Sequence, residues 1–400
     1  MRTAIVGGGA AGFFLAINLK EMVPEMEVTI FEKQQRVLAK VEISGGGRCN
    51  CTNTFAGIKD LSAVYPRGHR LMKRLMKSFD QHDSYLWFER HGVRLTIQDD
   101  GCVFPASQDS HSIINCFLMS AQRLGIMINR GCSVTSLDSL NSFDFVVVTT
   151  GGSPRPEGLR WLMDKGHDIA NPVPSLFSFR IDDTSLQALM GTVVENTIAY
   201  IPGANLRADG ALLITHWGMS GPAILKLSSY AARLLAEHGY QLPMAVNWTA
   251  MHDAEVFAEL ESFAVRHPQK QLSTINPFGL PARLWSYLVC KCLGERANGR
   301  WDSLNKKELN RLANLMSGGD TYQIAGRAPF KDEFVTCGGV TLSSVNPSTL
   351  ESRSMTGLYF AGEVLDIDGV TGGFNFQAAW TTAYTVALSI ARKVEENKVI

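Results

Sequence analysis

The residues best suited to chemistry in this chain are a glycine-rich turn and an acidic residue that follows it. The segment Gly7-Gly8-Gly9-Ala10-Ala11-Gly12 fits the pattern G-x-G-x-x-G, comes directly after an apolar run and opens a helical pattern. In such a turn Gly7 permits the tight bend, Gly9 lets the backbone approach a pyrophosphate, and Gly12 allows close helix packing. Glu32 ends the next apolar run, 20 residues after Gly12, where it can accept hydrogen bonds from a ribose. The pattern predicts a dinucleotide site, and an acid at position 32 disfavours a 2′-phosphate.

Two further glycine clusters favour FAD over NAD as the dinucleotide. Ser44-Gly45-Gly46-Gly47-Arg48 follows Glu32 by about a dozen residues, where bare backbone can lie against a flat, extended cofactor. Near the other end, Gly362-Glu363 follows an apolar run, and Gly372-Gly373-Phe374-Asn375 opens a helical pattern. The N-terminus of that helix would favour negative charge on the N1/O2 edge of a reduced flavin. Ordinary glycine turns without a ligand are the alternative, and three such clusters disfavour it.

Cys49 and His216 are the candidates for a catalytic side chain. Cys49 and Cys51 flank Asn50 beside the second cluster, where a thiolate could relay electrons or attack a substrate. We expect the two thiols to point apart and a C-x-C disulfide to be strained, so a packing role is favoured. His216, in the segment Thr215-His216-Trp217-Gly218, could act as a general acid, and a structural hydrogen bond in a turn explains it equally well.

Arg48 carries a charge that needs a partner if it is buried. We expect it to contact the cofactor or to pair with Glu363 or Asp366. No group of His, Cys, Asp and Glu has the spacing of a metal site, so we expect no metal.

The elements that must position these residues alternate between strand and helix at the start of the chain. Apolar runs at 3–6 and 28–31 on either side of a helical pattern at 13–20 predict a parallel β-α-β unit. Helical patterns follow at 70–91 and 112–124. Strand-like runs at 133–137 and 143–149 complete this part, and the second ends in Thr150-Gly151-Gly152.

The pattern changes after Pro172-Val173-Pro174. Polar alternation over 181–246 predicts a β-rich module, and helical periodicity returns over 253–316, with Asn305 as a cap and Glu308 three residues later. Strand and glycine return at about 334, and a helix is predicted at 375–392. The simplest organisation is one α/β domain built from both ends of the chain and interrupted by an insert.

Composition excludes several classes of protein. The chain has 400 residues, of which 45% are hydrophobic and 19% charged, as in a globular chain of two or three packed units. Lys plus Arg and Asp plus Glu each number 38, and no Lys/Arg stripe is evident, so we expect no nucleic acid partner. The eight cysteines lack the spacing of a secreted disulfide framework, and no export signal or apolar span is evident. We therefore expect a cytoplasmic protein with no membrane partner.

Four segments resemble one bacterial family. They are VGGGAAG (6–12), ISGGGRCNCTN (43–53), THWGMSGPAIL (215–225) and LYFAGEVLDIDGVTGGFNFQAA (358–379). They are similar to the aminoacetone-oxidase-like FAD-binding flavoproteins, which are related to a proposed bile-acid reductase. The resemblance runs from Thr3 to about Ala387. One departure is Leu38-Ala39-Lys40-Val41-Glu42, which stands where the family carries a basic Arg-Lys-Leu-Leu type of sequence and leaves only Lys40 to contact a phosphate.

The resemblance implies an α/β fold with a Rossmann-like FAD domain of glutathione-reductase type, interrupted by a β-barrel-like and a helical insert. We expect the FAD domain at 1–180 and 334–400 and the insert at 181–333, with 181–250 β-rich and 251–320 helical. It also implies that Val134 lies near adenine. The residues expected at FAD are Gly7, Gly9, Ala10, Ala11, Gly12, Glu32, Lys33, Lys40, Ser44, Gly45, Gly46, Gly47, Arg48, Val134, Gly151, Gly362, Glu363, Gly373, Phe374 and Asn375.

The leading functional hypothesis is an FAD-dependent oxidoreductase that transfers a hydride between the flavin and a small organic substrate. No second G-x-G-x-x-G follows a strand, so NAD(P)H is expected only as a transient co-substrate, and reductase and oxidase remain open alternatives. A flavin-dependent RNA-modifying enzyme and a non-catalytic flavin-binding redox sensor are the other hypotheses. The oligomeric state is left open.

Overall fold

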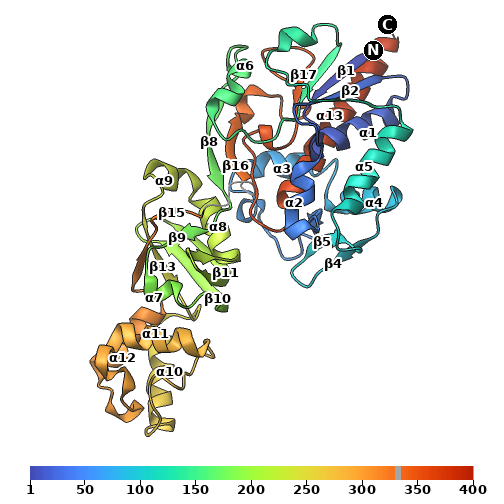
Figure 1. Cartoon of the computed structure of the whole chain (residues 1–400). Coiled ribbons are helices and arrows are strands. Elements are labelled where there is room, and N and C mark those ends of the chain that lie inside the picture. The colour runs from blue at the N-terminus through green and yellow to red at the C-terminus, as the bar shows by residue number, and fades with distance from the viewer. Residues whose placement is uncertain (329–334, 400) are drawn as a thin grey trace. The chain divides into compact units, whose positions relative to one another are not determined.

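The chain divides into two compact units in the computed structural model, which describes residues 1–328 and 335–399 (Figure 1). The first unit comprises Met1–Pro174 and Asp332–Ile400, and the second comprises Ser175–Lys331. The boundary expected after residue 180 is six residues late, because β9 (Phe179–Arg180) pairs with β12 (Gly218–Ser220) and β15 (Gly326–Arg327) of the second unit. The boundary expected after residue 333 lies outside the described residues.

The first unit is built on a five-stranded parallel sheet with the order β17-β7-β1-β2-β6. β1 (Arg2–Val6) lies at its centre and continues through a glycine turn into α1 (Ala10–Met22). Val6 lies opposite Phe31 on one side and Val148 on the other, so three strands end together beside that turn. The predicted β-α-β unit is thereby confirmed. The remaining strands of the sheet are β2 (Glu27–Glu32), β6 (Met127–Arg130), β7 (Phe145–Val148) and β17 (Leu358–Phe360).

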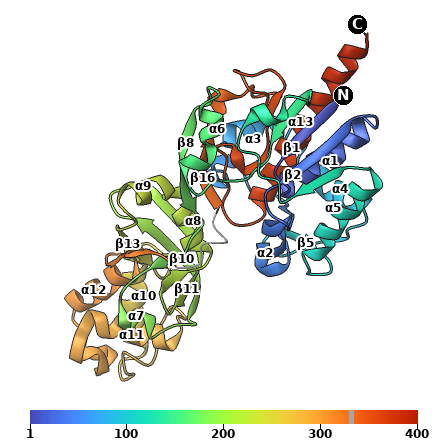
Figure 2. The same cartoon turned by 45° about the horizontal axis from the view of Figure 1, so that its top comes forward.

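Aromatic side chains hold two helices against each other in the first unit. α13 (Phe374–Val399) packs along α1 (Figure 2). Between them Phe14 lies 4.5 Å from Trp87 and 5.1 Å from Trp380, measured between ring centroids, and all three are almost fully buried. Burying each such side chain contributes about 1.5–3 kcal/mol, so this cluster fixes the N-terminal ends of α1 and α13 in one body.

Smaller elements surround this core. The other helices of the first unit are α2 (Ala39–Gly47), α3 (His69–Leu75), α4 (Gln81–Arg90), α5 (His111–Arg123) and α6 (Arg160–Met163). A three-stranded antiparallel sheet contains β3 (Thr52–Asn53), β5 (Cys102–Pro105) and β4 (Leu95–Ile97), and a two-stranded sheet contains β8 (Ile169–Ser175) and β16 (Val335–Val340).

Two sequence predictions change in the first unit. The helical pattern at 70–91 divides into α3 and α4, because the Asp80 carboxylate caps the first turn of α4. The strand predicted at 133–137 is wrong, since 133–136 are irregular and Leu137–Leu140 forms a 3-10 helix. Half-buried and exposed side chains alternate over 131–136, which imitates a strand, while the edge of the sheet is formed by β6.

The second unit combines a seven-stranded sheet with a helical part. The strand order runs from β14 (Thr321–Gln323) through β13, β10, β11, β12 and β9 to β15. β14 and β15 are separated in sequence by two residues only, so one short segment supplies both ends of the sheet. The other elements are α7 (Thr184–Gln187), β10 (Val193–Ile201), β11 (Leu206–Thr215), α8 (Pro222–Tyr230), α9 (Ala232–Glu237) and β13 (Pro243–Asn247).

The helical part of the second unit consists of α10 (Asp253–Arg266), α11 (Ala282–Leu293) and α12 (Lys306–Met316). Trp285 and Trp301 stack in its core with ring centroids 6.1 Å apart. The predicted cap of α12 is confirmed, because Asn305 and Glu308 form reciprocal side-chain to backbone hydrogen bonds. Within the described residues of both units, no helix is long and apolar enough to cross a membrane.

Candidate functional site

The turn between β1 and α1 combines two packed glycines with one open glycine. Gly7 has φ +120°, and a Cβ there would lie 2.4 Å from the Thr149 carbonyl oxygen. A Cβ at Gly12 would lie 2.1 Å from the Gly7 oxygen, so neither position accepts a side chain. A Cβ at Gly9 would meet nothing within 4 Å, and no side chain caps α1 at this residue. The turn therefore presents bare backbone and the N-terminus of α1 to open space, as an anionic group requires.

Glu32 completes this turn from the end of β2. Its Oε2 accepts a hydrogen bond from the Gly8 N–H at 2.8 Å, and its Oε1 accepts one from the Gln34 N–H at 2.8 Å. The carboxylate retains lone pairs for further donors, because two oxygens offer about four acceptor sites. The structure thus places Glu32 beside the glycine turn, where an acceptor for ribose hydroxyls was expected.

The second glycine cluster interrupts α2. Ser44 departs from helical geometry, and Gly45, Gly46 and Gly47 all have positive φ, between 58° and 82°. A run of three left-handed residues is accessible only to glycine at low cost. A Cβ at Gly46 or Gly47 would meet nothing within 4 Å, so the backbone of the cluster is open on one side.

Arg48 does not find the acidic partners expected for it. Its guanidinium lies 4.3 Å from the centroid of the Phe104 ring and donates to the Gln108 Oε1 at 3.2 Å. These contacts fix Arg48 beside the antiparallel sheet, because a guanidinium stacks well on an aromatic face. A contact between Arg48 and the cofactor stays a prediction.

Glu363 pairs instead with Lys40, which lies at the start of α2, four residues before Ser44 of the second cluster. The Lys40 Nζ is 2.8 Å from the Glu363 Oε2, and the Thr336 N–H donates to Oε1 at 2.8 Å. Burial alone would raise the pKa of Glu363, but the Lys40 ammonium and the backbone N–H groups of Thr336 and Gly152 outweigh it and hold that pKa below its ordinary value. A charged carboxylate therefore faces Gly151, whose added Cβ would lie 3.6 Å from it.

The third cluster contacts the first cluster and the segment that directly follows the second. A Cβ at Gly362 would lie 2.9 Å from the Ala11 Cβ of the first cluster. At Gly373 it would lie 2.3 Å from the Thr52 carbonyl oxygen, five residues after the second cluster. The side-chain amide of Asn50 links the two segments: its nitrogen donates to the Thr52 carbonyl oxygen at 2.8 Å, and its oxygen accepts from the Gly373 N–H at 3.2 Å. The structure therefore brings together three clusters that are spread over most of the chain.

Asn375 and Phe374 shape the loop before α13. The Asn375 Oδ1 accepts from the Gly369 N–H at 2.8 Å, and its Nδ2 donates to the Gly369 carbonyl at 2.9 Å. Phe374 is 5% exposed, and its carbonyl accepts from the Tyr65 hydroxyl at 2.8 Å. Both side chains are engaged within the protein, so the contacts with FAD expected of them would come from backbone atoms.

The sequence analysis missed a segment that lies along the same loop. Arg67 Nε donates to Asp368 Oδ1 at 2.6 Å in a two-point ion pair, and Asp368 is fully buried. The Val370 N–H donates to the Val64 carbonyl at 2.9 Å, and a Cβ at Gly68 would lie 2.7 Å from Ile367. These partners are about 300 residues apart, and no local pattern of sequence links them.

Cys49 and Cys51 do not point apart as expected. Their sulfurs lie 4.0 Å from each other, because Cys49 has φ +61° and the chain bends there. Both are fully buried, and burial together with the neighbouring Cys49 raises the pKa of Cys51 well above its ordinary value. Because the Cys49 side chain is fully enclosed, a substrate cannot reach its sulfur in this conformation, which weighs against a catalytic Cys49.

Three other candidates come from different parts of the chain. His216 is exposed at the turn between β11 and β12 in the second unit, 4.3 Å from Trp217 between ring centroids. Val134 is half-buried and packs beside Val6 at the end of β1. Lys33 is exposed directly after Glu32. Their roles stay predictions.

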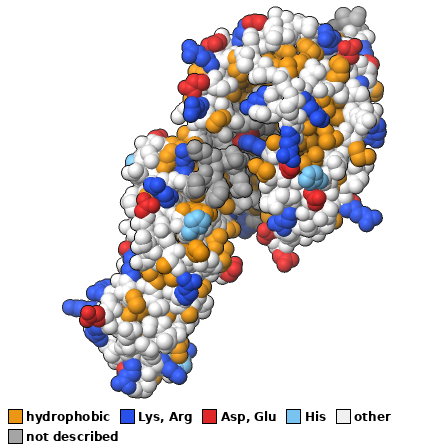
Figure 3. Space-filling view, in the orientation of Figure 1, with side chains coloured by type: hydrophobic (Ala, Val, Ile, Leu, Met, Phe, Trp, Pro, Cys, Tyr) orange, Lys and Arg blue, Asp and Glu red, His pale blue; other side chains and the backbone are white. Residues whose placement is uncertain are grey.

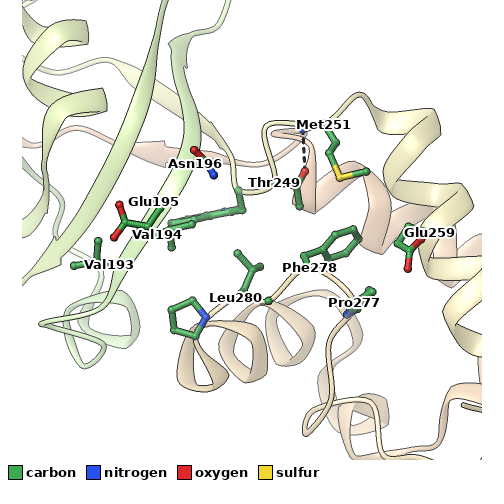
Figure 4. Close-up of a pocket in the computed structure, with 13 residues that line it drawn as sticks. Val193, Val194, Glu195, Asn196, Thr249, Met251, Glu259, Pro277, Phe278 and Leu280 are labelled. Atoms are coloured by element: carbon green, nitrogen blue, oxygen red, sulfur yellow. Dashed lines mark hydrogen bonds between the residues drawn. The ribbon is translucent and has the colours of Figure 1, made fainter. Parts of the chain in front are cut away.

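A cavity of about 560 Å³ lies within the second unit (Figure 4). It opens where β10 carries a register shift between Val194 and Thr197, and Phe278 and Met251 lie across it. It contains none of the residues expected at FAD.

Among the described side chains of either unit, no group of three or more His, Cys, Asp or Glu is arranged to hold a metal ion.

The first unit is a dinucleotide-binding Rossmann domain, defined by its parallel sheet, glycine turn and acidic residue at the end of β2. The chain belongs to the HI0933-like family, whose description is "HI0933-like protein Rossmann domain" and whose match covers residues 1–389. It is accordingly an FAD-dependent oxidoreductase.

Three characterised relatives align over nearly their whole length. The ribosomal RNA dihydrouridine synthase of Haemophilus influenzae is 27% identical over 97% of this chain and 98% of its own. The 3-dehydro-bile acid delta(4,6)-reductase of Clostridium scindens is 26% identical over 98% and 99%, respectively. The ribosomal RNA dihydrouridine synthase of Escherichia coli is 26% identical over 96% of both chains.

Proposed function

We propose that this oxidoreductase is a reductase that saturates a carbon–carbon double bond conjugated to a carbonyl group. The names of the three relatives support one shared chemistry. Dihydrouridine is uridine with the ring double bond saturated, and a delta(4,6)-reductase of a 3-dehydro compound saturates double bonds conjugated to a ketone. In both substrates the carbonyl makes the distal carbon of the double bond an acceptor for hydride.

The residues present fit FAD as the cofactor. The observation that carries this assignment is the hydrogen bond that the Glu32 carboxylate accepts from the Gly8 N–H, directly beside the open backbone of Gly9. The pyrophosphate would lie against Gly9 and the first turn of α1, and the ribose at Glu32. The open backbone at Gly46 and Gly47 and the N-terminal end of α13 would face the rest of the molecule.

Bound FAD supplies hydride chemistry that no side chain provides. The chain contributes orientation and electrostatics. The ion pair of Lys40 and Glu363 fixes the start of α2 against the turn that follows β17, and Arg67 holds the loop before α13. NAD(P)H is the proposed electron donor, bound transiently, because the sequence offers no second dinucleotide fingerprint.

Two substrate classes are compatible with this chemistry. The sequence analysis favoured a small molecule and disfavoured nucleic acid on two grounds, zero net charge and the lack of a Lys/Arg stripe. On the face drawn in Figure 3, blue and red side chains are interspersed. α3, however, carries several exposed basic residues on one side. A uridine base within RNA is therefore the second candidate substrate.

One anaerobic experiment tests the proposal. Denatured protein should release a flavin with absorbance bands in the near-ultraviolet and blue, and NADH or NADPH should bleach those bands in the native protein. A panel of conjugated ketones and unmodified ribosomal RNA should then be offered as oxidants, with air as a separate arm. Reoxidation by one of the double-bond substrates supports the reductase. Reoxidation by air alone would make the chain an oxidase, and resistance to both nicotinamides would favour a redox sensor.

The cytoplasm is the proposed compartment. All eight cysteines, each of which is described, are free thiols, and a reducing compartment maintains thiols in that state.

A further inference from the structure

We propose that the exposed side of α3 and the turn after it form a docking surface for the phosphate backbone of RNA. The α3 stripe, as we call it, comprises Arg70, Lys73, Arg74 and Lys77. This inference rests on the proposed function, because it names the substrate class that the reductase would meet. Its evidence is nevertheless separate, since it comes from the charge and exposure of these side chains.

The stripe follows from helical spacing. Lys73, Arg74 and Lys77 stand three, four and seven residues after Arg70, and all four are exposed, whereas Leu71, Met72 and Leu75 are buried on the opposite side. Along the axis the stripe spans about 10 Å, comparable to about three successive phosphates of one strand at 3.4 Å each. The surface therefore matches the charge spacing of a nucleic acid backbone.

The charges of the stripe are largely unneutralised. Among the described residues, Arg70, Lys73 and Lys77 form no salt bridge or side-chain hydrogen bond, and Arg74 donates only to the neutral hydroxyl of Ser348. Between positions 59 and 77 the chain carries six Lys or Arg residues and one acid, Asp60. The Asp60 carboxylate accepts from the N–H and the hydroxyl of Ser62, although it also attracts Lys73 and His69.

The position of the stripe gives it a functional meaning. α3 begins directly after Arg67 and Gly68, which pair with Asp368 and pack on Ile367 in the loop before α13. Arg70 is therefore less than one helical turn from the segment that holds the third glycine cluster. RNA held on the stripe would lie beside the proposed flavin site, and one base would have to leave its stack to react.

An anionic membrane is the competing partner for a basic helix. Membrane-surface helices combine basic residues with exposed apolar side chains that enter the lipid. The apolar residues of α3 face the protein interior, and its exposed side carries Arg70, Lys73 and Arg74, followed by Lys77 and Ser78 in the turn. This composition favours RNA phosphates.

The test compares two charge-matched triple variants of the flavin-loaded protein. Arg70→Gln/Lys73→Gln/Lys77→Gln removes three charges from the stripe. Lys270→Gln/Lys306→Gln/Lys307→Gln removes three exposed lysines from the second unit, which also lack side-chain partners among the described residues. The probe is ribosomal RNA transcribed in vitro, and the dissociation constant is measured against salt concentration.

We expect the stripe variant to bind RNA about tenfold or more weakly near physiological salt, with a salt slope lower by about two, because each lost phosphate contact removes about 0.7–0.9 from it. The control variant should remain within about twofold of the unaltered protein. Flavin content and flavin reduction by NAD(P)H should be equal in all three proteins. Arg70→Lys, which keeps the charge, should retain RNA affinity.

Three results would overturn the inference. The first is no RNA binding by the unaltered protein, and the second is an equal loss of RNA affinity in the two variants. The third is a stripe variant that keeps its RNA affinity but loses binding to anionic vesicles of phosphatidylglycerol and phosphatidylcholine. Dihydrouridine formation is scored separately. If the stripe variant loses RNA affinity while no protein forms dihydrouridine, the surface stands and the proposed reaction fails. If dihydrouridine forms equally with the stripe variant and the unaltered protein, the reaction stands and the surface fails.

Discussion

Lys40 and Glu363 form an ion pair across 323 positions of sequence, with 2.8 Å between the Nζ and Oε2 atoms. The pair joins α2, at the second glycine cluster, to the residue after Gly362 in the third. Its side chains are 56% and 21% exposed, so solvent screens the attraction. Its main effect is to keep the Glu363 carboxylate ionised and in place.

Replacing Lys40 should change the response of the protein to acid. The pKa of Glu363 is lowered in the folded state, so its contribution to stability is present above the unfolded-state pKa and is lost as pH falls through the folded-state value. Lys40→Met should raise the folded-state pKa and lower the unfolding free energy at neutral pH by at most about 1 kcal/mol. The stabilising contribution of Glu363 should also become smaller. Melting temperatures between about pH 3 and pH 7 measure this, with the exposed Lys33→Met as control. Superimposable profiles for the two variants would contradict the assignment.

Alanine at Gly7 should affect the stability of the fold, whereas alanine at Gly9 should affect FAD binding. Gly7→Ala forces a Cβ to 2.4 Å from the Thr149 oxygen at φ +120°, so it should lower the melting temperature or prevent folding. Gly9→Ala adds its methyl to open space and should leave the melting temperature of the FAD-free protein unchanged while weakening FAD binding. Thermal unfolding and FAD titration distinguish the two effects. Normal FAD affinity in a folded Gly9→Ala protein would place the pyrophosphate elsewhere.

Glu32→Ala should weaken FAD retention more than Cys51→Ala does. The first removes a charged acceptor held at the turn by Gly8, and hydrogen bonds to charged groups contribute about 1.5–3 kcal/mol, equivalent to about tenfold or more in affinity. The second shortens a buried side chain in the loop beside β3. The ratio of flavin to protein after dialysis reports the order. The reverse order would mean that the cofactor has been misplaced.

The first glycine turn and its surroundings were predictable from sequence because the determinants are local. Gly7, Gly12 and Glu32 lie within one β-α-β unit, and their spacing follows from the length of a strand and a helix. The Asn305 cap was predictable for the same reason. In these cases a few neighbouring residues carry all the information.

The contacts that assemble the site were not predictable in this way. Arg48 seemed the natural partner of Glu363, but the bend at Gly45–Gly47 directs it to Phe104 and leaves Lys40 to form the pair. The left-handed φ of Cys49 brings two sulfurs together that an extended chain would not. The Arg67 to Asp368 pair joins residues 301 positions apart. Each depends on backbone geometry or topology, neither of which appears in a local pattern.

The thiols should report their burial directly. Burial raises the pKa of Cys102 to about 11 and that of Cys116 to about 12, and Cys51 is shifted in the same direction. At about pH 8 a thiol reagent should therefore label the exposed Cys290 first, while these three react only after unfolding, because the thiolate is the reactive form. Cys290→Ser should abolish the fast phase. Rapid labelling of Cys51 in the folded protein would restore a redox role for the Cys49 and Cys51 pair.

The Arg67 to Asp368 pair should contribute far more to stability than an exposed pair does. Asp368 is fully buried, so Arg67→Met leaves its carboxylate in the interior without the guanidinium, and we expect a loss of about 3–5 kcal/mol in unfolding free energy. Arg36→Met, which breaks the exposed pair with Glu42, should cost at most about 1 kcal/mol. Urea unfolding measures both. Arg67→Met/Asp368→Leu should recover much of the stability, because it removes the buried charge as well, and it should still bind FAD poorly if the pair positions the loop before α13. Equal small losses in Arg67→Met and Arg36→Met would show that Asp368 has another sufficient partner and that the loop does not depend on Arg67.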